Sequence, residues 1–370
     1  MFKSSMGDLP VLNIHKGSGN KDMFDVYDAV RFVKPHAVVT IGDHWNFWYM
    51  RQVKIKSGFS FSWIPYLTVE ADEIEPKWSS MLRYADAIAV PSLFGKSVIE
   101  SYVQREAHFI PYGTEKAFQR LPSKRRRRLR KEKGCDDKVR FITVAQNTHR
   151  KNLPALIQAV KLIAHRDPKR NMQFHLYTNM NPDAREEYLY DLRELVSKFG
   201  VEDRFVFPED ADETFSLFEA PSDDYMNDQY GMADFFVLPS TCEGYGLPLV
   251  EAMACGVVPI ANASSTIPEH LGAPEGQTFG LTERGFLVSN RVEVHPPARL
   301  TKTVRQDALG QAIWEAYMMS KDPEGQRILD GMRDLCEEYG KGRDWETMKI
   351  ALCNVVETVA GKPRVAIEEL

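Results

Sequence analysis

The apolar positions of this chain fall into short runs that alternate with stretches of helical spacing. Short apolar runs bounded by turn or helix-start residues predict the buried strands of a parallel sheet. The predicted strands cover residues 37–41, 87–90, 140–145, 174–178, 205–207, 235–238 and 257–260. Helical spacing marks residues 94–103, 153–163 and 345–359. This alternation predicts an α/β protein with doubly wound sheets.

A strongly basic stretch at residues 124–133 separates the two series of strands. A chain of 370 residues is long enough for about two domains of ordinary size. We therefore predict a linker at residues 121–138. The basic stretch itself is either a solvated helix or hinge, or a surface for an anionic partner such as lipid head groups. It lacks the interleaved aromatic residues that favour nucleic-acid binding, so no specific nucleic-acid partner is expected.

The segment after the predicted strand at residues 235–238 places two carboxylates around a glycine turn. Glu243 precedes Gly244 and Gly246, and Glu251 lies within a helix that has proline in its first turn. The first amides of such a helix and the positive end of its dipole favour phosphate, whereas the glutamates are acceptors for hydroxyl groups. A nucleotide sugar combines both kinds of group. A strand-turn-helix joint with two solvated acids is the alternative.

Residues 243–256 resemble the paired-glutamate motif of the retaining GT-B glycosyltransferases of family 4, the glycosyl transferases group 1. Further segments resemble the family in the same order, at residues 84–92, 110–114, 230–234, 238–240 and 264–269. The resemblance covers most of the chain beyond about residue 84. It implies two facing Rossmann-like, doubly wound domains with a cleft between them. The first would comprise residues 1–120 and a returning helix at 345–370, and the second, residues 139–344, would bind the nucleotide sugar.

The resemblance also implies roles for the residues of the motif. Glu251 would bind the ribose hydroxyls of the donor, and Glu243 would bind the transferred sugar. The turn and the helix start would cradle sugar and phosphate through the backbone of Gly244, Tyr245, Gly246 and Leu247. The donor expected on this basis is a UDP- or GDP-sugar.

Residues 149–153 follow the first strand of the predicted second domain and resemble the basic loop with which the family holds the donor diphosphate. Lys151 matches the family's lysine, and Arg150 is the candidate for a second cation. The family usually has an arginine a few residues earlier, where this chain has Gln146 and Asn147; Asn147 is assigned to the donor site. Cations at this place would stabilise negative charge on the departing phosphate. A capped, solvated helix start is the alternative.

Acceptor-side candidates follow two apolar stretches in the first half of the chain. His44 and Asp43 follow the predicted strand at residues 37–41, and Glu70 and Asp72 follow an apolar stretch at residues 64–69. A structural histidine and helix-capping acids are the alternatives. Nearby aromatic residues could stack on sugar rings, contact a lipid-linked acceptor or pack in the core. They are Trp45, Phe47, Trp48, Tyr49, Phe59, Phe61 and Trp63. Gly17 and Gly19 stand where the family has a glycine-rich loop.

Composition narrows the class of protein further. With 43% hydrophobic residues, 27% charged residues and a net charge of −5, the chain is expected to be globular and soluble. No apolar run approaches the roughly 18 residues of a membrane span, and the first residues lack a signal-peptide pattern. The expected location is the cytoplasm, with peripheral membrane contact through residues 124–133 as an open alternative. The five scattered cysteines predict free thiols rather than disulfides or structural zinc.

The function expected from these residues and the resemblance is that of a retaining, metal-independent glycosyltransferase of the hexosyltransferase type. It would move a sugar from a nucleoside diphosphate to an acceptor hydroxyl on a glycan, lipid or other molecule, with no cofactor and no metal site. Two alternatives stay open. One is another GT-B enzyme, such as a phosphorylase or an epimerase, and the other is a noncatalytic protein that binds sugar nucleotides.

Overall fold

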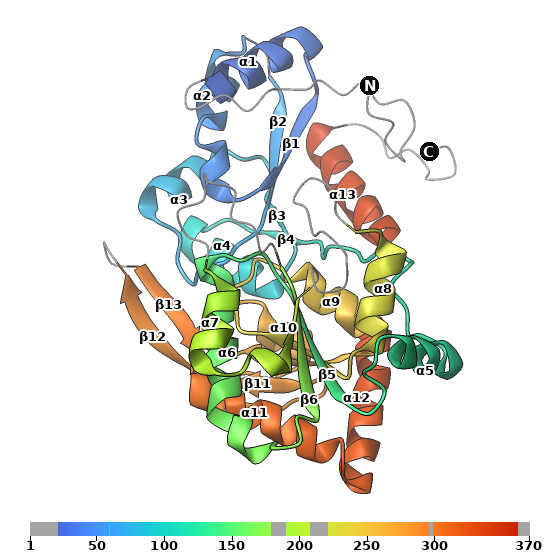
Figure 1. Cartoon of the computed structure of the whole chain (residues 1–370). Coiled ribbons are helices and arrows are strands. Elements are labelled where there is room, and N and C mark those ends of the chain that lie inside the picture. The colour runs from blue at the N-terminus through green and yellow to red at the C-terminus, as the bar shows by residue number, and fades with distance from the viewer. Residues whose placement is uncertain (1–20, 59, 179–189, 208–220, 296–298, 362–370) are drawn as a thin grey trace. The chain divides into compact units, whose positions relative to one another are not determined.

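The structure is a computed structural model that describes residues 21–58, 60–178, 190–207, 221–295 and 299–361 (Figure 1). The chain divides into two compact units. The smaller unit takes its residues from 1–91, 95–110 and 349–370, and the larger from 92–94 and 111–348. Each unit contains a sheet whose strands are mainly parallel, so the predicted α/β class is confirmed.

The smaller unit is built on a parallel sheet with the strand order β1-β2-β3-β4 in the described residues. These strands are β1 (Ala37–Gly42), β2 (Ser62–Leu67), β3 (Ala89–Val90) and β4 (His108–Phe109). Helix α1 (Lys21–Val33) precedes β1, and the helical elements between the strands are η1 (His44–Phe47), α2 (Met50–Lys56), α3 (Pro76–Leu82) and α4 (Leu93–Val103). Trp63 and Tyr66 are fully buried, and the indole of Trp63 donates to Thr40 Oγ1 at 3.1 Å, which joins β2 to β1.

The larger unit contains a sheet with the strand order β10-β11-β9-β8-β5-β6-β7 in the described residues. Its strands are β5 (Val139–Val144), β6 (Met172–Tyr177), β7 (Phe205–Val206), β8 (Phe235–Leu238), β9 (Val258–Asn262), β10 (Gly280–Leu281) and β11 (Phe286–Val288). All pairs are parallel except β10 with β11. A separate antiparallel hairpin joins β12 (Asn290–His295) to β13 (Arg299–Val304).

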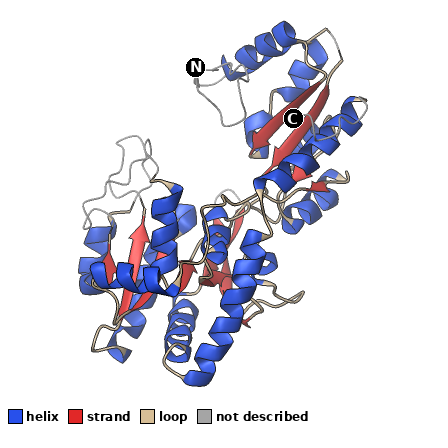
Figure 2. Ribbon diagram, turned by 90° about the vertical axis from the view of Figure 1, so that its right-hand side faces the viewer, coloured by secondary structure: helices blue, strands red, loops and turns tan. Residues whose placement is uncertain are grey.

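Helices flank this sheet on both sides, as Figure 2 shows. They are η2 (His149–Lys151), α6 (Leu153–Ile163), η3 (Ala164–Arg166), α7 (Leu192–Phe199), η4 (Glu202–Arg204), α8 (Asp223–Met232), α9 (Leu247–Ala254), α10 (Ile267–Leu271), α11 (Gln306–Met319) and α12 (Pro323–Lys341). A further helix, α13 (Trp345–Ala360), ends the described chain, and its residues from 349 onward belong to the smaller unit.

Successive residues of the buried strands point to opposite faces of the larger sheet and so form two cores. Phe141 and Phe235 belong to the core that α6, α7 and α11 cover, whereas Ile142 and Phe236 belong to the core beneath α8 and α9. The rings of Phe141 and Phe235 stack at 5.2 Å between their centres. A sheet that is buried on both faces explains why its strands read as continuous apolar runs.

The basic stretch that was expected as a linker contains a helix of the larger unit, α5 (Ser123–Glu132). Arginines of α5 attach it to α8 and to the start of β8. Arg125 contacts Asp228 at 2.8 Å, and Arg126 and Arg130 contact Asp234 at 2.7 and 3.0 Å. Much of the positive charge in this segment therefore serves to hold the helix against its own unit.

Candidate active site

The order of the strands brings two loops of the larger unit together. From β5 the chain runs outward through β6 to β7, and it then returns to place β8 on the other side of β5. Parallel neighbours whose connections leave in opposite directions open a crevice at the carboxyl edge of the sheet, where such folds bind ligands. The loop after β5 carries Arg150 and Lys151, and the loop after β8 carries Glu243.

These three side chains form a compact ionic cluster. The ammonium of Lys151 donates to both carboxylate oxygens of Glu243, at 2.6 and 2.9 Å. Arg150 donates to the same carboxylate at 3.1 Å and to the carbonyl of Cys242 at 2.9 Å. The side chains of Glu243 and Lys151 are only 5% and 11% exposed, whereas that of Arg150 is 34% exposed. The sequence-predicted residues Lys151, Arg150 and Glu243 are thus in direct contact.

The charge of this cluster is positive. Burial alone would raise the pKa of Glu243, but the charges of Lys151 and Arg150 and hydrogen bonds hold the pKa below its usual value. The carboxylate is therefore ionised at neutral pH, and two cations surround one anion. The remaining positive charge suits a phosphate-bearing ligand.

The glycine turn after Glu243 is fixed from beneath by residues of the loop and helix that follow β9. Ser265 accepts a hydrogen bond from the Glu243 amide at 2.8 Å, and Thr266 donates to the carbonyl of Tyr245 at 3.1 Å. His270 Nε2 lies 2.6 Å from the same carbonyl. Because a carbonyl only accepts, this nitrogen must carry the proton. Burial lowers the pKa of His270 to about 3, so the ring is neutral.

Gly246 gives the turn its sharp entry into α9. Its φ is +89°, a conformation that residues with a side chain rarely adopt, and it occupies the N-cap position of the helix. The first turn of α9 contains proline and no acidic residue, which leaves the positive end of the helix dipole at the loop. Tyr245 is buried and donates through its hydroxyl to the carbonyl of Tyr112 at 3.0 Å. Tyr245 thus supports the turn through both its backbone and its ring.

Glu251 lies one turn into α9, as the sequence predicted, and meets a tyrosine that was not assigned a role. The hydroxyl of Tyr230, on α8, donates to Glu251 at 2.9 Å. Burial raises the pKa of Glu251 to about 7, and the hydrogen bond from Tyr230 opposes this rise. A carboxyl group with this pKa is close to half ionised at neutral pH.

Two asparagines lie near Lys151 in the loop after β5. The side-chain amide of Asn147 donates to the carbonyl of Tyr190 at 2.7 Å and accepts from the Tyr190 amide at 3.4 Å. It therefore ties the loop after β5 to the segment before α7. Asn152 occupies the N-cap position of α6, where its φ is +50° and its side chain makes no capping hydrogen bond.

The acceptor-side candidates lie at one edge of the sheet in the smaller unit. β1 and β2 are parallel neighbours, and Asp43 after β1 accepts a hydrogen bond from Thr68 after β2 at 2.7 Å. His44 is buried against the ring of Trp78, and burial lowers its pKa from the ordinary value. Glu70 also follows β2 and is half-buried, and Asp72 is exposed. Gly17 and Gly19 lie outside the described residues.

The aromatic cluster of the smaller unit divides between core and surface. Phe47, Tyr49, Phe61 and Trp63 are buried, whereas Trp45 and Trp48 are each 41% exposed. Phe59 lies outside the described residues. Trp48 lines a cavity of about 850 Å³ between α2 and α3, together with Trp78 and Tyr84. The cations at this cavity are Arg51, Lys56, Lys77 and Arg83, and no acidic side chain lines it.

Within the described parts of the chain, no group of three or more His, Cys, Asp or Glu side chains is placed to hold a metal ion. In the same residues, no helix is both long enough and apolar enough to cross a membrane. All five cysteines are free thiols.

Solved structures with similar folds cover most of this chain. Sucrose-phosphate synthase from Thermosynechococcus elongatus matches 92% of this chain and 78% of its own with a TM-score of 0.68 and 20% identity. Anabaena HepE, solved in complex with UDP-glucose, matches 91% of this chain and 82% of its own with a TM-score of 0.64 and 13% identity. The chain therefore has the GT-B fold, as the sequence predicted.

Family and sequence matches agree with this fold. Residues 125–294 match the model of the family described as Glycosyl transferases group 1, so this part of the chain is similar to the domain of that family. Mannosylfructose-phosphate synthase of Agrobacterium fabrum is 28% identical over 162 residues, which are 43% of this chain and 33% of that protein. The chain thus aligns with about a third of the length of this relative.

Proposed function

We propose that this chain transfers a sugar from a nucleoside-diphosphate sugar to an acceptor hydroxyl, with retention of configuration at the anomeric carbon and without a metal ion. The main support for the proposal is that Lys151 and Arg150 form ion pairs with Glu243 at the carboxyl edge of the larger sheet. Glu251 stands on the helix that begins at the same turn. This arrangement offers cations for a diphosphate and carboxylates for hydroxyl groups on either side of it.

In the proposed reaction, the departing diphosphate takes the electron pair of the bond to the anomeric carbon. The sugar then carries oxocarbenium character, as in glycoside hydrolysis. Lys151 and Arg150 would stabilise the charge on the leaving phosphate, assisted by the amides of Gly246 and Leu247 at the start of α9. Protein cations supply the charge compensation that a metal ion would otherwise provide, which supports metal independence.

Glu251 would accept hydrogen bonds from the ribose hydroxyls, and Glu243 would accept from hydroxyls of the transferred sugar. The hydrogen bonds from Ser265, Thr266 and His270 to the turn support this role, because they fix the backbone before the donor arrives. A prearranged site loses less entropy on binding. Asn147 would act on the donor only indirectly, by holding the loop that carries Lys151.

The donor proposed is a UDP- or GDP-sugar. HepE, which has a similar fold, is solved with UDP-glucose, and this supports a uridine nucleotide as the first choice. The retaining outcome is supported by the likeness of residues 243–256 to the motif of retaining enzymes. The acceptor proposed is a glycan, lipid or other hydroxyl compound held by the smaller unit, where His44 and Glu70 follow neighbouring strands.

The proposal is tested by incubating the full chain with UDP- and GDP-sugars in the presence of EDTA. A donor is first chosen by its stabilising effect on thermal unfolding, since a ligand of the folded state raises the unfolding temperature. We expect nucleoside diphosphate to be released from that donor, and transfer to a hydroxyl acceptor to preserve the anomeric configuration by NMR. Binding without release in any acceptor screen would favour the noncatalytic alternative. Activity that disappears with EDTA and returns with a divalent cation would contradict metal independence.

A further inference from the structure

A second polar cavity lies at the opposite edge of the larger sheet. It has a volume of about 460 Å³ and lies between α5 and α12. Ala233 and Asp234, which line it, come before β8, and Gly256 comes before β9. The turn with Glu243 instead follows β8, at the carboxyl edge. The cavity is therefore separate from the proposed donor site.

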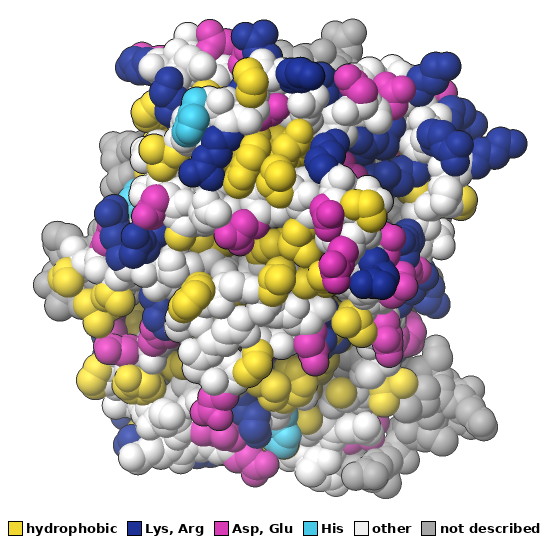
Figure 3. All heavy atoms as spheres, turned by 90° about the horizontal axis from the view of Figure 1, so that it is seen from below, with side chains coloured by type: hydrophobic (Ala, Val, Ile, Leu, Met, Phe, Trp, Pro, Cys, Tyr) yellow, Lys and Arg dark blue, Asp and Glu magenta, His cyan; other side chains and the backbone are white. Residues whose placement is uncertain are grey.

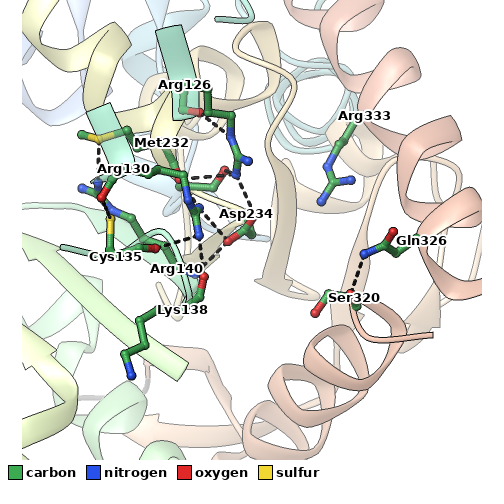
Figure 4. Close-up of polar contacts among 12 residues, drawn as sticks. Arg126, Arg130, Cys135, Lys138, Arg140, Met232, Asp234, Ser320, Gln326 and Arg333 are labelled. Carbon is green, nitrogen blue, oxygen red and sulfur yellow. Dashed lines mark hydrogen bonds and ion pairs between the residues drawn. The ribbon is translucent and has the colours of Figure 1, made fainter. Parts of the chain in front are cut away.

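The walls of this cavity carry more positive than negative charge. Its lining includes five arginines, at positions 120, 126, 127, 130 and 333, and three aspartates, at positions 136, 234 and 330. In Figure 4, Arg126 and Arg130 converge on Asp234, and Arg333 extends from α12. Figure 3 shows Lys and Arg side chains gathered on the side of the molecule where α5 lies. Arg120 is already paired with Asp334, which does not line the cavity, at 2.6 Å. The positive charge available to a ligand therefore comes from the other four arginines.

The arginines differ in how many of their donors are already used. Arg130 is 8% exposed and donates to Asp234, Met232, Cys135 and Lys138, so it is a structural clamp. Arg126 donates through Nε and Nη2, and its Nη1 makes no hydrogen bond to the described residues. Arg127 has no partner in those residues either.

Arg333 completes this group from the other wall. Its guanidinium donates to Asp330 through Nη1 alone among the described residues, at 2.6 Å. Burial lowers the pKa of Arg126, Asp234 opposes that change, and the positive charges of Arg130 and Arg333 add to the lowering. The guanidinium groups of the two walls are thus close enough to repel one another. An anion placed between them would remove this repulsion.

The start of α5 adds to the positive field at the cavity. Lys124, Arg125 and Arg126 occupy its first turn, which contains no acidic residue, and the N-cap Pro122 offers no side-chain hydrogen bond. Cations at this end oppose the helix dipole, because the unpaired amides there already carry partial positive charge. Ser123, the first residue of the helix, lines the cavity. Both the arginines and the helix start therefore favour a bound anion.

We propose that this cavity binds the phosphate group of a small anionic ligand, separate from the sugar donor. Guanidinium groups bind phosphate oxygens in paired hydrogen bonds, and Arg126, Arg127 and Arg333 retain donors for this purpose. The volume falls within the range of about 300–1,000 Å³ that is usual for small-molecule sites. The phosphate could belong to a free metabolite or to a lipid head group, and the experiment below separates these two sources.

The test uses the full chain and pyrophosphate as the probe for isothermal titration calorimetry. The variant is Arg127→Gln with Arg333→Gln, and the matched control is Arg128→Gln, since Arg128 is on the same helix, is 67% exposed and does not line the cavity. Neither substituted arginine of the variant holds α5 in place, so both proteins should fold, which circular dichroism checks. We expect the double variant to bind on the order of 100-fold more weakly, about tenfold for each charged hydrogen-bonding group lost.

Vesicles of phosphatidylglycerol, with phosphatidylcholine as the neutral comparison, test the second source. Sedimentation with phosphatidylglycerol that needs Arg127 and Arg333, without pyrophosphate binding, would assign the phosphate to a lipid. Pyrophosphate that binds at the donor site would still bind to the double variant, so this outcome distinguishes the donor site from the proposed cavity. The proposal is overturned if the double variant binds pyrophosphate and vesicles as tightly as the unaltered protein does. It is also overturned if the double variant and the Arg128→Gln control lose binding to the same extent.

Discussion

Replacing Lys151 with methionine should destabilise the larger unit, because it leaves a buried carboxylate with fewer partners. Glu243 is only 5% exposed and receives two hydrogen bonds from Lys151, at 2.6 and 2.9 Å. Removing one partner of a buried ion pair costs about 3–5 kcal/mol. Arg150 remains at 3.1 Å, so we expect a smaller loss of about 2–3 kcal/mol. Methionine keeps most of the side-chain volume, so the loss reports on charge.

The loss should appear as a lower unfolding temperature. For a unit of this size, 1 kcal/mol corresponds to about 2–4 °C, so Lys151→Met should unfold about 4–12 °C below the unaltered protein at pH 7. Differential scanning calorimetry measures the difference. Lys161→Met is the matched control, since Lys161 is an exposed residue of α6, and its unfolding temperature should change little.

The same variant makes a prediction about pH. In the unaltered protein the folded pKa of Glu243 lies below its usual value of 4.5. Its contribution to stability is therefore full above about pH 4.5 and is lost as the pH falls through the folded pKa. Without Lys151 burial dominates and the pKa rises, so the deficit of the variant should shrink as the pH falls from 7 toward 4. Equal unfolding temperatures for Lys151→Met and Lys161→Met, or a deficit independent of pH, would refute the reasoning.

Three further outcomes are expected. Because the pKa of Glu251 is about 7 and the ionised form is the stronger acceptor, donor affinity should increase as the pH rises through 7. Tyr230→Phe should raise the midpoint pH of this increase, measured by calorimetric titration of the donor, because it removes the hydrogen bond that lowers the pKa of Glu251. Glu251→Gln should abolish the pH dependence. Gly246→Ala should lower the free energy of unfolding by about 1–2 kcal/mol in urea, because φ is +89° there, whereas Gly331→Ala on α12 should not lower it. Asp234→Asn should lower the free energy of unfolding by about 3–5 kcal/mol in the same assay, because Arg126 and Arg130 both pair with that carboxylate. A decrease below about 1 kcal/mol would contradict the inference that these ion pairs hold α5 against the larger unit.

The sequence predicted the larger unit better than the smaller one. The strand at residues 235–238 was predicted with its observed bounds, because a strand buried on both faces has a continuous apolar run. In the smaller unit the apolar stretch at residues 64–69 was not predicted as a strand, although β2 covers Ser62–Leu67. For the basic stretch at residues 124–133 a helix was only one of the alternatives, since a run of like charges does not by itself distinguish a helix from a hinge.

In the candidate site, residues within a local sequence motif could be predicted, whereas residues that contact the motif through tertiary packing could not. Glu243 and Glu251 became candidates because they flank a glycine turn between a buried strand and a helix, and Lys151 because residues 149–153 resemble the family's basic loop. Tyr230 and His270, which hold Glu251 and the glycine turn, were not assigned, because their contacts join residues 21 and 25 positions apart. Such contacts depend on how helices pack on the sheet, and the spacing of residues along the chain does not encode them.

The most direct test of the central claim compares donor kinetics in the unaltered protein, Glu251→Ala and Lys151→Ala. Release of nucleoside diphosphate is followed with the donor that stabilises the protein most, at a temperature where all three are folded. We expect Glu251→Ala to raise the donor KM strongly, because ribose contacts are lost, and Lys151→Ala to lower kcat, because charge on the leaving phosphate is less stabilised. Unchanged donor KM and kcat in both variants would show that the nucleotide sugar does not react at this site.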